Sequence, residues 1–115
     1  MKVDFYKHNI GPAEIERMVE TLGSTFLTTG PRTRAFEAQL QDYLGVAHAI
    51  GVSSWTTGAF ISLKAMGVSP GDEVITTPMT FISSANVIVH CGATPVFVDV
   101  EPATGNIDVS LIEAA

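Results

Sequence analysis

Apolar residues in the first part of the chain recur with a helical period. Ile15, Met18, Val19 and Leu22 are spaced by three and four residues, while acidic side chains occupy the other face. Pro12 stands where a helix can begin, because its missing N–H needs no partner in the first turn. The pattern predicts a surface helix from residue 12 to about residue 22.

A second helical pattern follows a Gly-Pro loop. Thr33 is the expected N-cap and Gly45 the expected end of this helix. The residues predicted to point inward are Phe36, Leu40, Tyr43 and Leu44.

After residue 45 the period changes to short, β-rich runs separated by helical segments. The last run is apolar on both faces apart from Asp99, which is typical of a parallel strand covered on both sides. The alternation of strand and helix predicts an α/β fold with a mostly parallel sheet. The predicted strands are 46–52, 74–77 and 95–100, and the predicted helices are 56–66 and 81–90.

The last residues read as a turn and an unfinished helix. A turn is predicted at 101–106, and Asp108 or Ser110 is expected to open a helix that stops at Ala115 after about two turns. We therefore expect a truncated domain, with residues 1–45 as a helical N-terminal segment and residues 46–115 as the first βαβαβ portion. The C-terminal remainder of the domain is expected to be missing.

Charge and composition disfavour some classes of binding partner and favour a folded domain. The formal net charge of −6 argues against nucleic acid or an anionic membrane as a partner, and the 46% apolar content suits a packed core. The charged N-terminus does not resemble a signal peptide, so a cytoplasmic location is expected. Cys91 is predicted to be a buried structural thiol. The histidines show no metal-ligand spacing, and no metal is predicted.

Two segments carry hydroxyl side chains from a strand end into a helix start. They are residues 53–57 and residues 76–80. Free backbone N–H groups and the helix dipole at such starts attract anions, so the pattern predicts a phosphorylated cofactor. Neither a P-loop nor a Gly-x-Gly-x-x-Gly fingerprint is present, which disfavours ATP and NAD. A compact phosphate monoester held without a metal suits these groups better.

Several segments resemble the DegT/DnrJ/StrS group of nucleotide-sugar aminotransferases, which are fold-type I enzymes dependent on pyridoxal 5'-phosphate (PLP). The resemblance covers essentially the whole chain, in the same order and spacing. The matching segments are Ser53-Ser54-Trp55-Thr56, Pro70-Gly71-Asp72-Glu73-Val74-Ile75, Thr80-Phe81-Ile82 and 92–100, together with Thr28-Thr29-Gly30-Pro31 and Phe36-Glu37.

The resemblance implies a role for several residues. Thr56 and Thr57 correspond to the pair that binds the PLP phosphate, and Phe81 to the aromatic residue stacked on the pyridine ring. Without the family match, a helix cap and a core phenylalanine would be the simpler readings of these residues. Trp55 stands where many members have glycine, and its ring is expected either at the cofactor's rim or a partner subunit, or in a core gap.

Two further assignments concern the substrate and the strand end. The loop at Thr29 and Gly30 resembles the segment bordering the sugar-nucleotide pocket. Asp99 is interpreted as structural, accepting hydrogen bonds from neighbouring loop N–H groups, because the family's pyridine partner comes from a later strand.

The family's chemistry is amino transfer, usually from glutamate, to a nucleotide-linked keto-sugar in polysaccharide, glycolipid or antibiotic biosynthesis, carried out by a homodimer. Lys2, Lys7 and Lys64 do not resemble the Schiff-base lysine, which in the family lies far beyond position 115, so the 115 residues alone are expected to be inactive. Two alternatives remain open. One is another fold-type I enzyme, such as a desulfurase or sugar dehydratase, and the other is a non-catalytic domain that binds a phosphate ligand.

Overall fold

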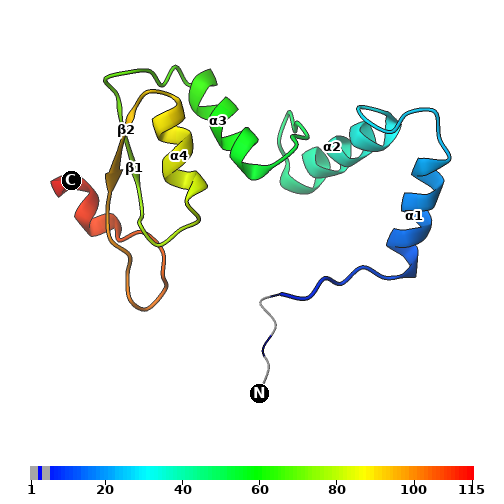
Figure 1. Ribbon diagram of the computed structural model, residues 1–115, viewed down its shortest axis with the longest axis horizontal. Coiled ribbons are helices and arrows are strands. Elements are labelled where there is room, and N and C mark those ends of the chain that lie inside the picture. Colours follow the sequence, from blue (N-terminus) through cyan, green and yellow to red (C-terminus); the bar gives the residue numbers. More distant parts are fainter. Residues whose placement is uncertain (1–2, 4–5) are drawn as a thin grey trace. The chain divides into compact units, whose positions relative to one another are not determined.

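The computed structural model describes residue 3 and residues 6–115, which form two compact units, Met1–Gly51 and Val52–Ala115 (Figure 1). The first unit contains two helices. The second contains helices on a short parallel sheet, so the chain has the expected α/β fold.

The two helices of the first unit begin at prolines. α1 spans Pro12–Leu22, as predicted, and α2 spans Pro31–Leu44. The prediction that Thr33 caps α2 is wrong. Gly30 is the N-cap, because Pro31 supplies a helical φ without needing a partner for an N–H group, and the Thr33 hydroxyl donates instead to the Thr28 carbonyl at 3.2 Å.

Glycine ends α2 as predicted. Gly45 has a φ of 65°, in the left-handed region where glycine is strongly favoured, and its N–H donates to the Gln41 carbonyl.

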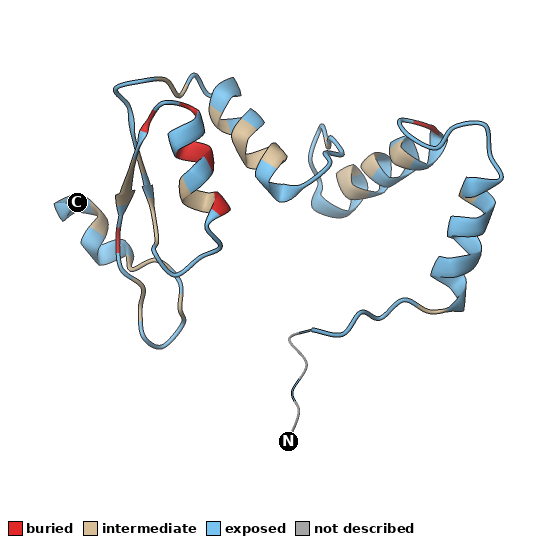
Figure 2. Ribbon diagram, in the orientation of Figure 1, coloured by how far each residue is buried: buried red, intermediate tan, exposed pale blue. Residues whose placement is uncertain are grey.

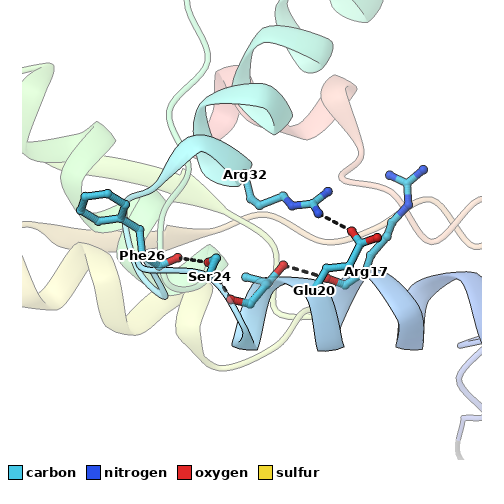
Figure 3. Close-up of polar contacts among 6 residues, drawn as sticks. Arg17, Glu20, Ser24, Phe26 and Arg32 are labelled. Carbon is cyan, nitrogen blue, oxygen red and sulfur yellow. Dashed lines mark hydrogen bonds and ion pairs between the residues drawn. The ribbon is translucent and has the colours of Figure 1, made fainter.

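Polar contacts organise the connection between α1 and α2 (Figure 3). The Arg32 guanidinium pairs with the Glu20 carboxylate at 2.5 Å. The Ser24 hydroxyl lies 2.7 Å from the Thr21 carbonyl and 3.1 Å from that of Phe26, so the turn folds back on the end of α1. Both partners of the ion pair are more than half exposed, so we expect it to orient the loop more than it stabilises the fold.

The apolar faces of α1 and α2 are exposed. No described residue of either helix is buried, and Phe36, Tyr43 and Leu44 are 55%, 85% and 59% exposed. The prediction that these α2 side chains point inward is therefore wrong for this structure. The sequence pattern marks a face able to pack, but burial requires another element against it, and among residues 6–51 none buries this face.

The second unit is built around two parallel strands. Its elements are α3 (Trp55–Ala65), β1 (Glu73–Thr76), α4 (Ser83–His90), β2 (Thr94–Phe97) and the 3-10 helix η1 (Val109–Ala114). β1 and β2 pair from Glu73 with Thr94 to Thr76 with Phe97, which confirms the predicted parallel arrangement. α4 connects the two strands along the chain, as a parallel pair requires.

The core lies around α4, which packs against β1 and β2 and also against α3 (Figure 2). Val87, Ile88 and Ala93 are buried, and Phe60 and Leu63 of α3 pack against them, as their shared helix face predicted. α4 buries only one face, since Ile82 before it and Val89 within it are 65% and 58% exposed. The Cys91 thiol is buried beside this core, as predicted, and its structural role stays a prediction.

The predicted strand over 46–52 does not form. A strand exists through ladder hydrogen bonds to a neighbour, and among the residues that the structure describes β1 and β2 pair only with each other. The described backbone gives this segment a different contact, because the Gly51 N–H donates to the Glu37 carboxylate at 2.7 Å.

The region after β2 is a turn followed by a short helix, as expected. Val100 and Ile107 form an antiparallel bridge, and the Asp99 carboxylate accepts the Val100 N–H at 2.8 Å, in agreement with its structural role. Asp108 caps the final helix by accepting the Ser110 N–H at 2.9 Å. This helix is of the tighter 3-10 type.

Candidate functional site

The start of α3 combines a side-chain cap with free backbone donors. Ser54 is the N-cap, and its hydroxyl oxygen accepts the Thr57 N–H at 3.1 Å. The Thr57 hydroxyl lies 3.1 Å from that of Ser53 and 3.0 Å from that of Ser54. Thr57 is thus already engaged by the cap. The N–H groups of Trp55 and Thr56 have no acceptor within residues 6–115 and remain available to a ligand.

The starts of α3 and α4 lie together. The Thr56 hydroxyl donates to the Ser83 hydroxyl across 27 sequence positions, at 3.1 Å. Ser83 is 7% exposed, so this contact is anchored on the inner side of α4. In the turn before α4, the Thr80 and Ser84 hydroxyls lie 2.9 Å apart. The fold therefore joins the start of α3, which the sequence singled out, to the start of α4, which lies three residues beyond the predicted segment 76–80.

A cavity of about 270 Å³ lies between α3 and α4. One end carries hydroxyls and the rest is lined by apolar, amide and imidazole groups. No carboxylate borders the cavity, so nothing on its wall repels an anion, and no lysine or arginine borders it either. Its lining residues are Thr56, Thr57, Phe60, Ser83, Asn86, Val87 and His90.

The hydroxyl end of this cavity fits a phosphate monoester. The 11-residue helix α3 begins at this end of the cavity, so its positive dipole end lies there, together with the unpaired N–H groups of its first turn. The Thr56 hydroxyl, which donates to Ser83 in the structure, is a further polar group at this end. Backbone N–H groups and hydroxyls of this kind suit a compact phosphate such as that of PLP. In the described part of the chain, no three His, Cys, Asp or Glu side chains gather in a way that could hold a metal ion.

Trp55 occupies an ordinary helical position. It is the first residue of α3, and no non-glycine residue in the described chain has a positive φ, so glycine is not required there. The Trp55 ring is 62% exposed and borders a second cavity of about 300 Å³ that α3 and α4 form with β1. Its role toward the cofactor remains a prediction.

Phe81 lies in the turn before α4 and is 75% exposed. It borders neither of these two cavities. Its stacking on a cofactor ring also stays a prediction, although its exposure leaves the ring face available to a ligand.

Thr29 and Gly30 belong to the first unit. Gly30 is buried at the start of α2, and a Cβ atom there would lie 2.8 Å from the Cβ of Phe26, so close packing explains the glycine. Thr29 is exposed. The loop before α2 adjoins a cavity of about 280 Å³, lined by Glu20, Ser24, Thr25, Phe26, Pro31 and Arg32. The role of Thr29 and Gly30 in substrate binding remains a prediction.

Lys64 is directed away from the start of α3. Its ammonium group donates to the Val68 carbonyl at 3.2 Å, beyond the C-terminal end of the helix. Thr56 lies at the other end, so Lys64 is held apart from the hydroxyl end of the cavity.

Residues 8–115 match the model of the DegT/DnrJ/EryC1/StrS aminotransferase family. The chain belongs to this family. It is 50% identical over 106 residues to the spore coat polysaccharide biosynthesis protein SpsC of Bacillus subtilis, a match that covers 92% of the chain and 27% of SpsC.

Solved structures of related aminotransferases show the same fold. Spr1654 of Streptococcus pneumoniae, named as a sugar aminotransferase and solved in its PLP form, matches with a TM-score of 0.91 and 39% identity, over 100% of this chain and 29% of its own. NtdA of Bacillus subtilis, solved with bound PMP, matches with a TM-score of 0.84 and 36% identity, over 92% of this chain and 25% of its own. This family member thus spans between a quarter and a third of the length of these relatives.

Sequence reasoning did not select Ser83. The serine follows Thr80 by three positions at a helix start, so its hydroxyl was a visible signal. Its partner, however, lies on another helix, and only the packing of α3 on α4 reveals the contact.

No helix in the described part of the chain is both long enough and apolar enough to cross a bilayer.

Proposed function

We propose that this chain is part of a PLP-dependent aminotransferase that transfers an amino group, with glutamate as donor, to a nucleotide-linked keto-sugar. The product would enter polysaccharide, glycolipid or antibiotic sugar biosynthesis. Family membership supports the reaction class, and the names of SpsC and Spr1654 support a sugar as the acceptor. The PLP and PMP forms of the relatives support the cofactor.

The observation that carries the proposal is the meeting of two hydroxyl-bearing helix starts at Thr56 and Ser83. We assign the phosphate to the Trp55 and Thr56 N–H groups and the Thr56 hydroxyl, with Thr57 completing the cap that holds this turn. Phosphate binding at one end orients the remainder of the cofactor, since a fixed anion restricts both position and rotation.

Bound pyridoxal phosphate supplies an electron sink that allows an amino group to leave a donor and join a keto-sugar. The residues of this chain bind and orient the cofactor in this proposal. Phe81 would cover one face of the ring, and its exposed position suits that role. The Thr29–Gly30 loop would border the sugar nucleotide.

The lysine that bonds the cofactor and moves the substrate proton would come from outside residues 1–115. Lys64, the lysine of the second unit, donates to Val68 at the far end of α3. We further propose a homodimer, because the exposed apolar faces of the described helices can be covered by a second copy or by further parts of the chain.

The test uses the full-length enzyme with PLP, glutamate and a panel of nucleotide-linked keto-sugars. We expect 2-oxoglutarate to form in a single equivalent with glutamate alone and catalytically once the right keto-sugar is added. Binding of PLP without amino transfer would indicate another PLP enzyme. Absence of PLP binding would sink the proposal and favour a non-catalytic phosphate-binding domain.

A variant links this activity to the site. Thr56→Val removes the hydroxyl with little change of shape, and we expect it to weaken PLP binding about 10-fold or more, because a hydrogen bond to a charged group contributes roughly 1.5–3 kcal/mol. Thr104→Val is the matched control, since the Thr104 hydroxyl bonds Glu101 in the turn at 101–106. Equal PLP affinity in the two variants would contradict the assignment of Thr56.

A further inference from the structure

We propose that Ser83 is a positioning residue for the cofactor phosphate and acts through Thr56. The inference rests on the proposed function and adds a residue to the same site. Ser83 does not touch the phosphate in this account. It holds and polarises the hydroxyl that does.

Ser83 is the buried hydrogen-bond partner of Thr56, an exposed residue. The two hydroxyl oxygens are 3.1 Å apart, with Thr56 as donor and Ser83 as acceptor. Ser83 is 7% exposed and is followed on α4 by the buried residues Val87 and Ile88. Its oxygen is therefore fixed by the core, whereas Thr56 stands on the exposed side of the pair.

A hydroxyl has one hydrogen to donate and two lone pairs that accept. While Thr56 donates to Ser83, its hydrogen is not directed at a ligand. When a phosphate oxygen binds, the Thr56 hydrogen can turn toward it, and the Ser83 hydrogen can then turn toward Thr56. The described residues offer the Ser83 hydroxyl no other hydrogen-bond partner, and the reversal requires its side chain to turn, because the structure has Thr56 as the donor.

The reversed pair is stronger toward an anion than Thr56 alone. Successive hydroxyls that donate in one direction polarise one another, and the low exposure of Ser83 reduces competition from water. The other nearby hydroxyls are engaged elsewhere. Thr57 bonds Ser53 and Ser54, and Ser84 bonds Thr80. Ser83 is thus the described hydroxyl placed to support Thr56.

The test compares PLP with pyridoxal, which lacks the phosphate, in the full-length enzyme. We expect Ser83→Ala to weaken PLP binding about 3- to 10-fold, in line with the net contribution of one hydrogen bond, and to leave pyridoxal binding unchanged. Ser62→Ala, an exposed serine in the middle of α3, is the matched control and should bind both compounds like the wild type.

A double-variant cycle tests whether the effect passes through Thr56. Thr56→Val combined with Ser83→Ala should bind PLP no more weakly than Thr56→Val alone, because Ser83 has no route to the phosphate without the Thr56 hydroxyl. Additive losses, an unchanged PLP affinity in Ser83→Ala, or an equal loss of pyridoxal would each overturn the inference. Failure of the proposed function looks different, because Thr56→Val itself would then leave PLP binding intact.

Discussion

Gly92 connects α4 to β2 with a φ of 83°, a left-handed conformation that side chains with a Cβ disfavour. A Cβ at this position would also lie 2.8 Å from Cγ of Pro70. Backbone conformation and close packing thus both require glycine here. The turn that aligns β2 beside β1 depends on this single residue.

We expect Gly92→Ala to lower the free energy of unfolding by more than the roughly 1–2 kcal/mol of the conformational penalty alone. Gly67→Ala is the matched control, because Gly67 has a φ of 89° but nothing within 4 Å of the added Cβ. Denaturant unfolding monitored by circular dichroism measures both variants. An equal loss in the two would show that the contact with Pro70 adds nothing.

At the scale of the element, helix starts set most of the local structure. α3 begins with a serine N-cap, whose hydroxyl accepts the Thr57 N–H. α1 begins with a glycine N-cap, and an acidic side chain three residues later accepts the glycine N–H. The Glu14 carboxylate accepts the Gly11 N–H at 2.8 Å. This bond satisfies a backbone donor that the helix itself leaves unpaired.

The stability of the first turn of α1 should decrease in acid. Hydrogen bonds from the backbone N–H groups of Gly11 and of Glu14 itself lower the pKa of the Glu14 carboxyl group, and Arg17 adds a smaller effect in the same direction. Because the folded pKa is lower than the unfolded one, the stabilisation is present above the unfolded pKa and is lost as pH falls through the folded pKa. We expect α1 to fray at its start in that acidic range.

An NMR titration of the Glu14 side chain, with the amide signals of residues 11–15, measures this effect. The midpoint should lie below that of the same carboxyl group in the urea-unfolded chain. Glu14→Gln serves as control, since its amide keeps an acceptor but has no charge to titrate. Identical midpoints in the folded and unfolded chain would refute the capping argument.

On the scale of the whole molecule, little apolar surface is buried. The buried hydrophobic residues in the described structure are Val87, Ile88, Cys91, Ala93 and Val98. All belong to the second unit, and within the described part of the chain neither β1 nor β2 has a neighbouring strand on its outer edge. Unpaired edges and exposed apolar faces favour association with other chains.

We expect the 115-residue chain to bind the dye ANS and to associate with increasing concentration in sedimentation experiments. Leu22→Lys should reduce both effects, because Leu22 is 67% exposed on the apolar face of α1. Glu16→Lys changes charge on the polar face of the same helix and serves as control. Equal behaviour of the two variants would exclude the apolar face of α1 as a cause of association.

Much of the fold could be predicted because its signals are local. Pro12 marked the start of α1, Gly45 the end of α2, and the run before Asp99 a strand of a parallel pair. Such signals act over a few residues through fixed φ angles, caps and side-chain periodicity. They can therefore be identified without knowing which other segments pack nearby. The family could be recognised for the same reason, from short segments in a fixed order.

By itself, the sequence determined the α/β class, the order of the helices and of the two paired strands, and the hydroxyl-bearing start of α3. Tertiary structure decided the rest. Among the described residues, 46–52 have strand chemistry but no ladder partner, and no apolar residue of α2 is buried. Ser83 meets Thr56 only because α3 packs on α4. Ladder bonds, burial and long-range hydrogen bonds require two segments to meet in space. The sequence of one segment does not identify the segment that it will contact.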